Sequence, residues 1–404
     1  MIHSSYYKPR VFPIKGDTVP PEIDRAQAID PTVSLNREKI EELGRDGVVG
    51  YLAQTPGVGI TLTQREYGSL EFFEKLANVA TSTTSLTLNS FKTPYFDICA
   101  YLEDDDGNFD GTVWYPNQRL SGFTITIGSP EALIDRSFTF AGEQAKILTD
   151  NNKYFVYIRE VVNSGELVLT AFAVTLDDPT PTANPDSASE TIFRVVRVRS
   201  GVSTELTYTT DFTYAAGTLT VLVAALSDVY KIYYSAATYI SGEDYFTEND
   251  TDLAGILANS ASLYLGSSNY LYKVQSATID VRFDREDVRE IGNENVVVRG
   301  IRNRTVTVTL GKLLDSWTIE EVLRGESVGY GLIDVKRFST DLTFIAAIYD
   351  DSDKETFKIG YTSTSMTPSD FTPGTGNIDQ YVNSGVTLEG EELTIADNAA
   401  EIGL

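Results

Sequence analysis

The feature that most constrains this chain is an internal repeat. Residues 27–62 align without a gap on residues 275–310, at a constant offset of 248 positions. Within that alignment, residues 36–44 and 284–292 share an arginine, two glutamates and a glycine. The register continues downstream with single-residue slips, so that residues 98–100 fall on 345–347 and residues 142–143 fall on 390–391. The sequence therefore predicts one domain that occurs twice.

The repeat predicts three regions. Residues 1–152 form the first copy, residues 153–260 a linker with a small inserted β-domain, and residues 261–404 the second copy. Residues 177–185 are rich in proline, threonine and aspartate, which is typical of an exposed linker. Strands are expected in the insert at 191–199, 204–208, 218–224 and 229–235, with a turn at 211–217.

Each copy has the same expected layout. A strand at 276–283 leads into an acidic–basic turn at 284–292, and strands at 295–298 and 304–310 follow, the last with strict alternation. A short helix comes next, at 317–323 after Ser316 or at 70–77 after Ser69. Strands at 342–349 or 95–102, and then around 385–395 or 138–148, close the copy. The predicted fold class is mainly β: two tandem β-sandwich or barrel domains, each with a short helix, plus a small all-β insert.

Composition excludes several kinds of protein. The chain has 58 acidic and 32 basic residues, a net charge of −26, which argues against ordinary nucleic-acid binders and against docking on anionic membranes. One cysteine and one histidine exclude disulfide frameworks, multi-thiolate metal sites and histidine-based catalysis. Paired-carboxylate hydrolysis stays open on residue types, but no spacing indicates a pair. We therefore expect no enzymatic activity, no cofactor and no metal site.

Several local features have both a functional and a structural interpretation. The acidic turn at 104–111 offers oxygen ligands for calcium, but it fails the spacing of an EF-hand loop, which favours a solvated hairpin tip. Cys99, Trp114 and Trp317 are expected to be core residues rather than reactive or binding groups.

Two groups of arginines are also ambiguous. Arg299, Arg302 and Arg304 suggest contact with a polyanion, but in so acidic a chain pairing with a neighbouring subunit's carboxylates is the favoured interpretation. Charged positions on an exposed sheet edge are the expectation for Arg194, Arg197 and Arg199.

The first seven residues lack the charged and apolar regions of a signal peptide, and no hydrophobic run approaches the length of a membrane span. We expect the protein to be made in the cytoplasm and to have no membrane partner.

Residues 272–292, in which a strand runs into an acidic turn, resemble a segment of bacteriophage tail tube proteins. The family motif is split here, because three residues separate Glu286-Asp287 from Ile291-Gly292. The resemblance covers the two repeats and not the insert. Duplication makes the chain similar to the tubes of long, non-contractile-tailed phages. That resemblance implies a tail-tube-like fold for each copy.

The resemblance also implies a function. The subunit would form trimeric, pseudo-hexameric rings that stack into a tube in the virion tail, after assembly in the host cytoplasm. An acidic lumen would repel double-stranded DNA and let it pass without binding. Implied partners are further copies of the chain and the tail terminator, baseplate or distal tail, and tape-measure proteins.

By the same analogy, two hairpins would line the lumen and pack on the adjacent ring. The expected contact residues are Asp284, Arg285, Glu286, Asp287 and Glu290, with their counterparts Asn36, Arg37, Glu38, Glu41 and Glu42.

Two alternatives remain open at this point. Another phage structural β-protein, such as a baseplate ring or capsid-surface protein, would be scarcer in the virion than a tube subunit. A secreted polysaccharide-binding or polysaccharide-cleaving β-protein is the third hypothesis, and a glycan-binding screen tests it.

Overall fold

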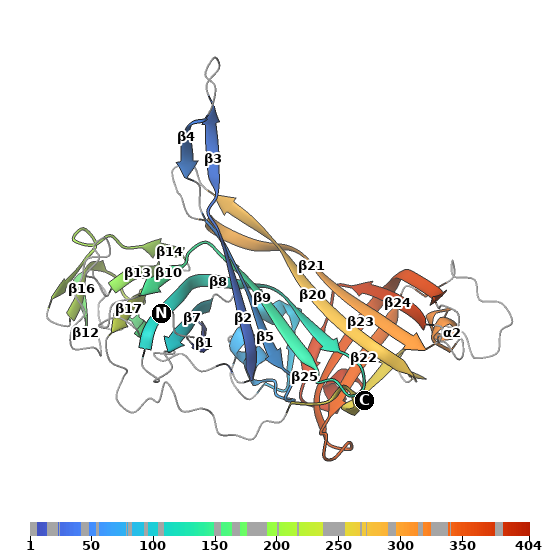
Figure 1. Cartoon of the computed structure of the whole chain (residues 1–404). Helices are drawn as coiled ribbons and strands as arrows, with labels where there is room; N and C mark the ends of the chain where they lie inside the picture. The colour runs from blue at the N-terminus through green and yellow to red at the C-terminus, as the bar shows by residue number, and fades with distance from the viewer. Residues whose placement is uncertain are drawn as a thin grey trace. The chain divides into compact units, whose positions relative to one another are not determined.

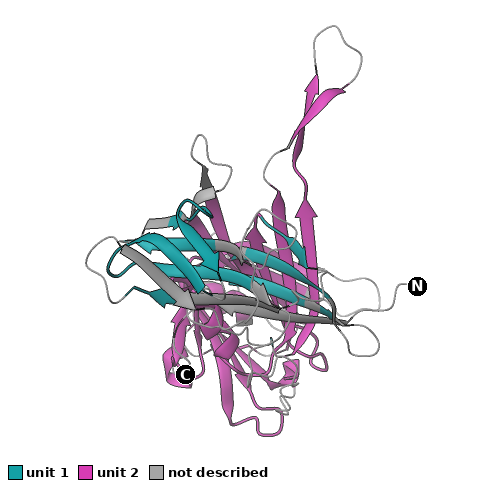
Figure 2. Ribbon diagram, turned by 90° about the vertical axis from the view of Figure 1, so that its left-hand side faces the viewer, with its two compact units in different colours: residues 1–23, 95–118, 144–250 teal, residues 24–94, 119–143, 251–404 magenta. Residues whose placement is uncertain are grey.

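The chain is mainly β in a computed structural model (Figure 1). Contacts between backbone positions divide it into two compact units (Figure 2). Unit one comprises Met1–Ile23, Tyr95–Gln118 and Gln144–Asp250, and unit two comprises Asp24–Pro94, Arg119–Glu143 and Thr251–Leu404. The structure describes residues 6–13, 23, 25–41, 48–53, 56–77, 79, 83–92, 96–103, 109–148, 155–163, 170–175, 192–199, 202–215, 218–236, 255–266, 269–271, 273–289, 296–313, 318–324, 338–339, 341–375 and 383–404.

Unit one contains three antiparallel sheets. The first has the order β1 (Tyr6–Pro13), β7 (Phe96–Glu103), the first half of β8 (Phe109–Ile127) and β10 (Lys146–Leu148). The second has the order β11 (Phe155–Val162), β17 (Val229–Ala236), β13 (Ile192–Arg199) and β14 (Val202–Glu205). The third has the order β12 (Thr170–Thr175), β16 (Thr218–Ala224) and β15 (Phe212–Ala215).

Trp114 lies on β8 between β7 and β10 in unit one. Its side chain is 1% exposed, its indole N–H donates a 2.9 Å hydrogen bond to Asp97, and its ring stacks on Tyr233 at a centroid distance of 6.3 Å. Cys99, on the adjacent strand, is fully buried. The core roles expected of Trp114 and Cys99 are confirmed, whereas Trp317 lies outside the described residues. The contact with Tyr233 packs the inserted strand β17 against β8.

Unit two contains one long antiparallel path of strands. Its order is the second half of β23 (Phe357–Thr375), β24 (Asn383–Gly390), β21 (Val296–Leu313), β20 (Val274–Arg289), the second half of β8, β9 (Asp135–Gly142), β5 (Gly57–Arg65) and β2 (Ala26–Ser34). A second sheet has the order β19 (Asn269–Tyr270), β18 (Ala261–Leu265), β22 (Leu342–Tyr349), the first half of β23, β25 (Thr394–Ala396) and β6 (Ser85–Thr87).

The remaining elements of unit two are short. A separate two-stranded ribbon consists of β3 (Arg37–Glu41) and β4 (Val48–Ala53). Among the residues that the structure describes, the α-helices are α1 (Glu71–Ala77) and α2 (Thr318–Arg324), and 3-10 turns lie at Leu88–Phe91, Ala258–Ser260 and Ala399–Ile402.

The repeat is visible in the positions of the elements. β8 and β23, β9 and β24, and β10 and β25 each begin and end 248 residues apart, and α1 and α2 begin 247 residues apart. Strand pairing repeats as well. Strands β5 and β2 of the first copy are equivalent to β21 and β20 of the second, and the orders β8–β9–β5–β2 and β23–β24–β21–β20 match strand by strand. Even a backbone irregularity recurs, with positive φ angles of 55° at Arg25 and 60° at Lys273. The boundaries at residues 152 and 260 stay a prediction, since the two compact units group the segments differently.

Helix α1 forms where the sequence places a cap and an apolar face. The Ser69 hydroxyl accepts a 3.1 Å hydrogen bond from the Glu71 N–H, as expected for a helix N-terminus. Phe72, Phe73 and Leu76 are then buried by the helix against the sheet. Phe73 makes edge-to-face contacts with Phe91, Phe123, Phe138 and Tyr361. In the second copy, Ser316 lies outside the described residues.

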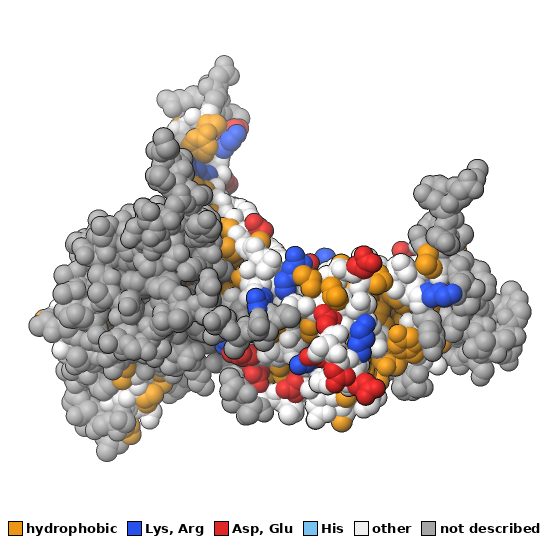
Figure 3. All heavy atoms as spheres, turned by 60° about the horizontal axis from the view of Figure 1, so that its bottom comes forward, with side chains coloured by type: hydrophobic (Ala, Val, Ile, Leu, Met, Phe, Trp, Pro, Cys, Tyr) orange, Lys and Arg blue, Asp and Glu red, His pale blue; other side chains and the backbone are white. Residues whose placement is uncertain are grey.

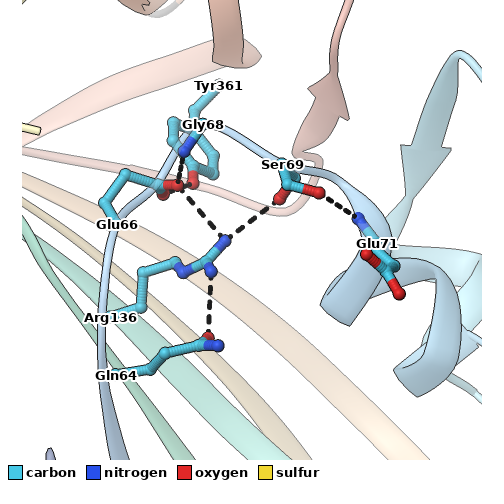
Figure 4. Close-up of polar contacts among 7 residues, drawn as sticks. All are labelled: Gln64, Glu66, Gly68, Ser69, Glu71, Arg136 and Tyr361. Carbon is cyan, nitrogen blue, oxygen red and sulfur yellow. Dashed lines mark hydrogen bonds and ion pairs between the residues drawn. The ribbon is translucent and has the colours of Figure 1, made fainter. Parts of the chain in front are cut away.

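A buried polar network joins the sheet to the start of α1 (Figure 4). The Arg136 guanidinium lies 3.3 Å from the Glu66 carboxylate, and both side chains are fully buried. Arg136 also donates to the Gln64 side chain at 2.9 Å and to the Ser69 carbonyl at 3.3 Å. Glu66 accepts from the Tyr361 hydroxyl at 2.6 Å and from the Gly68 N–H at 2.8 Å.

The neighbours of Arg136 keep its guanidinium charged. Burial, the largest single influence, lowers the pKa of Arg136, but the Glu66 carboxylate, Tyr361 and Tyr67 together outweigh it and raise that pKa. Burial and the same carboxylate hold the pKa of Tyr361 well above its ordinary value. The second copy has its own buried pair, with Lys312 at 3.6 Å from Glu320. Lys312 occupies the repeat position of Gln64, so both copies place a buried polar group beside the helix.

Three local predictions were wrong. Residues 284–289 form no turn, because β20 continues through them and pairs with β21 up to Val296, with register shifts on the way. Residues 296–313 form one strand instead of two. Residues 212–215 form β15 rather than a turn, because Phe212 is fully buried and the strand pairs with β16.

The expected exposed edge in the insert was also wrong. Strand β13, which carries Arg194, Arg197 and Arg199, pairs with β17 on one side and with β14 on the other. It is therefore an interior strand of its sheet. Arg199 forms two hydrogen bonds of 2.7 and 2.6 Å with the carboxylate of Asp228, so its charge is used within the unit.

Candidate assembly surface

The long sheet of unit two has two different faces. One face is apolar and buried, with Ile60 and Leu62 on β5, Ile279 and Val281 on β20, and further residues of the same kind on the other strands. The alternate positions point to the other face, where threonine is the commonest residue and the threonine side chains are exposed or partly exposed. These threonines are Thr32, Thr61, Thr63, Thr124, Thr126, Thr139, Thr278, Thr305, Thr307, Thr309 and Thr387. We call this surface the hydroxyl face.

Charged side chains are sparse on the hydroxyl face and most are acidic. Acidic residues on it are Asp30, Asp135, Asp280, Asp284, Asp370 and Glu389. Two basic side chains are neutralised there, Arg65 by Asp135 and Arg282 by Asp280 at 2.7 Å. Asp280 also accepts a 2.7 Å hydrogen bond from Thr124 across the β20–β8 junction. On the face shown in Figure 3, the acidic and basic side chains of described residues lie interspersed, without a patch of positive charge.

The ribbon of β3 and β4 exposes apolar side chains. Tyr51 is 60% exposed and Leu52 54%, Ile40 and Val49 are also exposed, and Leu35, just before β3, is 66% exposed. The ribbon lies beyond the ends of β2 and β5 and pairs only with itself among the described residues (Figure 1). A two-stranded hairpin alone is marginally stable in water. Exposed apolar groups on such a hairpin indicate a contact surface.

The predicted contact residues fall on two different structures. Asn36, Arg37, Glu38 and Glu41 lie on or next to the ribbon and are all exposed. Asp284, Arg285, Glu286 and Asp287 lie on the continuous strand β20, where Asp284 and Glu286 are exposed and the side chain of Asp287 is not described. Glu42 and Glu290 lie outside the described residues. The two copies therefore present the same positions differently, on a separate ribbon and on an unbroken strand.

Arg285 is held by the chain's own backbone. Its guanidinium donates to the carbonyls of Leu120 at 2.9 Å, Phe91 at 3.3 Å and Lys92 at 3.3 Å. Arg37, at the same repeat position, is exposed. In the first copy this position is thus available to a partner, whereas in the second it fixes β20 to the turn that follows β6.

Arg299, Arg302 and Arg304 were expected to pair with carboxylates of a neighbouring subunit, and for Arg304 this prediction was wrong. Arg304 pairs with Glu392 and donates to Asn89 at 2.7 Å, both in the same chain. Arg302 is exposed, and the side chain of Arg299 is not described.

A buried aspartate organises one end of the insert. Asp228 accepts hydrogen bonds from Arg199, from the Ala225 N–H at 2.7 Å and from the Tyr230 hydroxyl at 2.9 Å. These donors, chiefly Arg199, lower the pKa of Asp228 to about 2. Every partner belongs to the same unit, so the cluster ties β13 and β17 to the turn that precedes β17.

The acidic turns give no support to metal binding. Residues 104–108 lie outside the described residues. In the counterpart turn, Asp350 accepts from the Ser352 N–H at 2.9 Å and pairs with Lys358 at 2.9 Å, and these donors lower its pKa. Among the described residues no group of three histidine, cysteine or carboxylate side chains is arranged to hold a metal ion.

Within the described part of the chain, none of the helices is long and apolar enough to span a membrane. The chain matches no known family, and no curated protein matches it.

Sequence reasoning placed expected contact residues on the ribbon, but it missed the hydroxyl face and the exposed apolar side chains of the ribbon. The alternation of threonine with valine and leucine at 305–310 was the signal for the hydroxyl face, but it did not reveal which strands share that face. The strand order of the long sheet depends on pairing between residues hundreds of positions apart, which no local pattern encodes.

Proposed function

We propose that the chain is a non-enzymatic tail tube subunit of a virion, which forms trimeric, pseudo-hexameric rings stacked into a tube. The carrying observation is the long sheet of unit two. Two four-stranded halves of equivalent order are joined through β20 and β8, so one chain supplies two repeats of one wall element. Three such chains placed head to tail would supply six, and a closed ring leaves no strand edge open.

The two faces of the sheet support the lumen assignment. A wall that conducts DNA needs a surface without unpaired cations, because lysine and arginine bind phosphates tightly at moderate salt. The hydroxyl face meets that requirement, since Arg65 and Arg282 are each paired with an aspartate. Short hydroxyl side chains also leave a smooth surface. In this proposal the hydroxyl face lines the lumen and the apolar face lies under the helices.

The ribbon supports the stacking of rings. Its exposed apolar side chains, such as Tyr51 and Leu52, need a partner surface, and the adjacent ring supplies one in this proposal. Arg37, Glu38 and Glu41 around them would set the register by charge. The ends of the tube would then contact tail terminator, tape-measure and distal tail proteins.

Negative-stain electron microscopy of the purified chain at increasing concentration tests the proposal. The expected result is hollow rings or tubes, together with a copy number in virions among the highest of the structural proteins. A chain that stays monomeric at high concentration, with virions whose tube is another protein, would overturn it. A ring present in only a few copies would instead indicate a baseplate component.

A further inference from the structure

The long sheet of unit two has two edges that lack an outer partner within the described residues. Strand β2 pairs with β5 alone, and the second half of β23 pairs with β24 alone. Their repeat counterparts are β20 and β8, which pair with each other inside the chain. The chain thus contains one complete junction, between β20 and β8. The strands equivalent to its two sides, β2 and β23, lie at the two open edges and do not pair with each other in the described part of the chain.

The internal junction provides a register for the open edges. The offset of 248 holds for pairing in the central part of these strands, because Val33 opposes Val58 as Val281 opposes Val306. On the other side, Phe371 opposes Val386 as Phe123 opposes Phe138. The internal junction has six residue pairs, and moving each half by 248 positions gives six pairs between chains. Three of them are Val33 with Phe371, Thr32 with Thr372, and Ser34 with Asp370.

Burial agrees with this assignment. In the internal junction, Val281 and Phe123 oppose each other and are 0% and 1% exposed. At the open edge, the counterpart Val33 is 47% exposed. Pairing of β2 with β23 from a second copy would cover that side chain as the internal junction covers Val281.

We propose that β2 of one chain pairs antiparallel with β23 of the next in this register, and that two prolines weaken the junction. The proposal rests on the proposed ring. In the internal junction, Ile279 opposes Ile125. The same repeat positions at the open edges hold Pro31 and Pro373.

The prolines act through hydrogen bonding. Proline has no N–H to give to a neighbouring strand, and it is typical of edges that must not pair indiscriminately. A junction between two chains is therefore weaker than the internal junction of the same design. Two chains that meet in solution separate again, whereas a closed ring is held by all its junctions at once. The prolines thus keep free subunits apart until assembly.

Cysteine cross-linking tests the register. The single variants Thr32→Cys and Thr372→Cys are mixed, assembled and oxidised, and the native Cys99 does not interfere because it is fully buried. The expected result is a disulfide-linked pair of chains. The matched control replaces the second variant by Asp370→Cys, two residues out of register, and should cross-link several-fold less.

The outcomes separate this proposal from the proposed function. Tubes that form without Thr32–Thr372 cross-links, or with equal cross-linking in the control, overturn the register and leave the tube intact. Absence of both tubes and cross-links overturns both proposals. Tubes with cross-links confined to the expected pair confirm the junction.

A second experiment tests the prolines. The double variant Pro31→Ile with Pro373→Ile should assemble at roughly tenfold lower protein concentration, measured by light scattering. Each single variant should have an intermediate effect, which keeps the test valid if the double variant aggregates. The control Pro130→Ala changes an exposed proline away from both edges and should leave the threshold unchanged. An unchanged threshold in all the edge variants would overturn the role of the prolines.

Discussion

Tyr361 donates a 2.6 Å hydrogen bond from its hydroxyl to the carboxylate of Glu66, 295 positions away in the chain. The same carboxylate lies 3.3 Å from Arg136, and the Glu66 and Arg136 side chains are fully buried. This contact joins β23 of the second repeat to the residue that follows β5 of the first. Stability of unit two should therefore depend on the charge balance at Glu66.

Replacing Arg136 by methionine should lower the free energy of unfolding by about 3–5 kcal/mol, because it leaves a buried carboxylate without its cation. Urea denaturation measures the change. The matched control is Arg65→Met, since Arg65 pairs with Asp135 at a partly exposed position and should cost no more than about 1 kcal/mol. Adding Glu66→Gln to Arg136→Met should recover part of the loss. Equal effects of the two arginine substitutions would contradict this account.

The junction of β20 with β8 should be intolerant of bulk at Gly122. A Cβ at that position would lie 2.4 Å from the carbonyl oxygen of Val281, so Gly122→Ala should destabilise the chain by roughly 1–3 kcal/mol. The control is Gly59→Ala on β5, where a Cβ would meet no atom within 4 Å. It should be neutral or stabilise slightly. Thermal unfolding of both variants decides, and a tolerated Gly122→Ala would show that the two strands do not approach so closely.

Acid should loosen the insert through Asp228. Its pKa is about 2 in the folded chain against an ordinary value of 3.8, so the stability it contributes is complete above 3.8 and is lost as pH falls towards 2. The contribution is about 2 kcal/mol at neutral pH. Protection of the Ala225 amide against hydrogen exchange, relative to its intrinsic rate at each pH, should fall below pH 4 in the native chain. In Asp228→Asn, protection should already be low at pH 7 and should lack that pH dependence, and an unchanged profile would count against the assignment.

Polar substitutions in the ribbon should block stacking without unfolding the subunit. Tyr51→Ser with Leu52→Ser removes two side chains that are 60% and 54% exposed, so the free energy of unfolding should change by less than about 1 kcal/mol. Electron microscopy should then show single rings in place of tubes. The control Ile147→Ser removes a side chain that is 70% exposed on unit one and should leave tubes intact. Long tubes from the ribbon variant would remove the ribbon from the stacking contact.

The local elements of this fold could be predicted where pattern and packing agree. Alternation at 305–310 predicted part of β21, and Ser69 predicted the start of α1. Prediction failed where tertiary contacts override local preference. The charged run from Asp284 suggested a turn, yet Arg285 is bound by three backbone carbonyls and β20 continues as a strand. Residues 212–215 likewise form a strand in a segment rich in turn residues, because the side chain of Phe212 is buried.

The candidate surface was harder to predict than the elements. Pro31 and Pro373 are visible in the sequence, but their importance depends on the pairing of Ile279 with Ile125. That pairing joins strands from different repeats. Alignment of the repeats shows which residues are equivalent, but it does not show which strands are in contact. Only the strand order reveals that β20 and β8 pair within the chain while the equivalent strands β2 and β23 lie at open edges.

The rotational symmetry of the assembled protein tests the central claim most directly. Cryo-electron microscopy of the purified chain should show stacked rings of three chains with pseudo-sixfold symmetry, and the hydroxyl face should line the lumen. Rings of another order, a wall that presents the apolar face to the lumen, or a chain that remains monomeric at high concentration would contradict it.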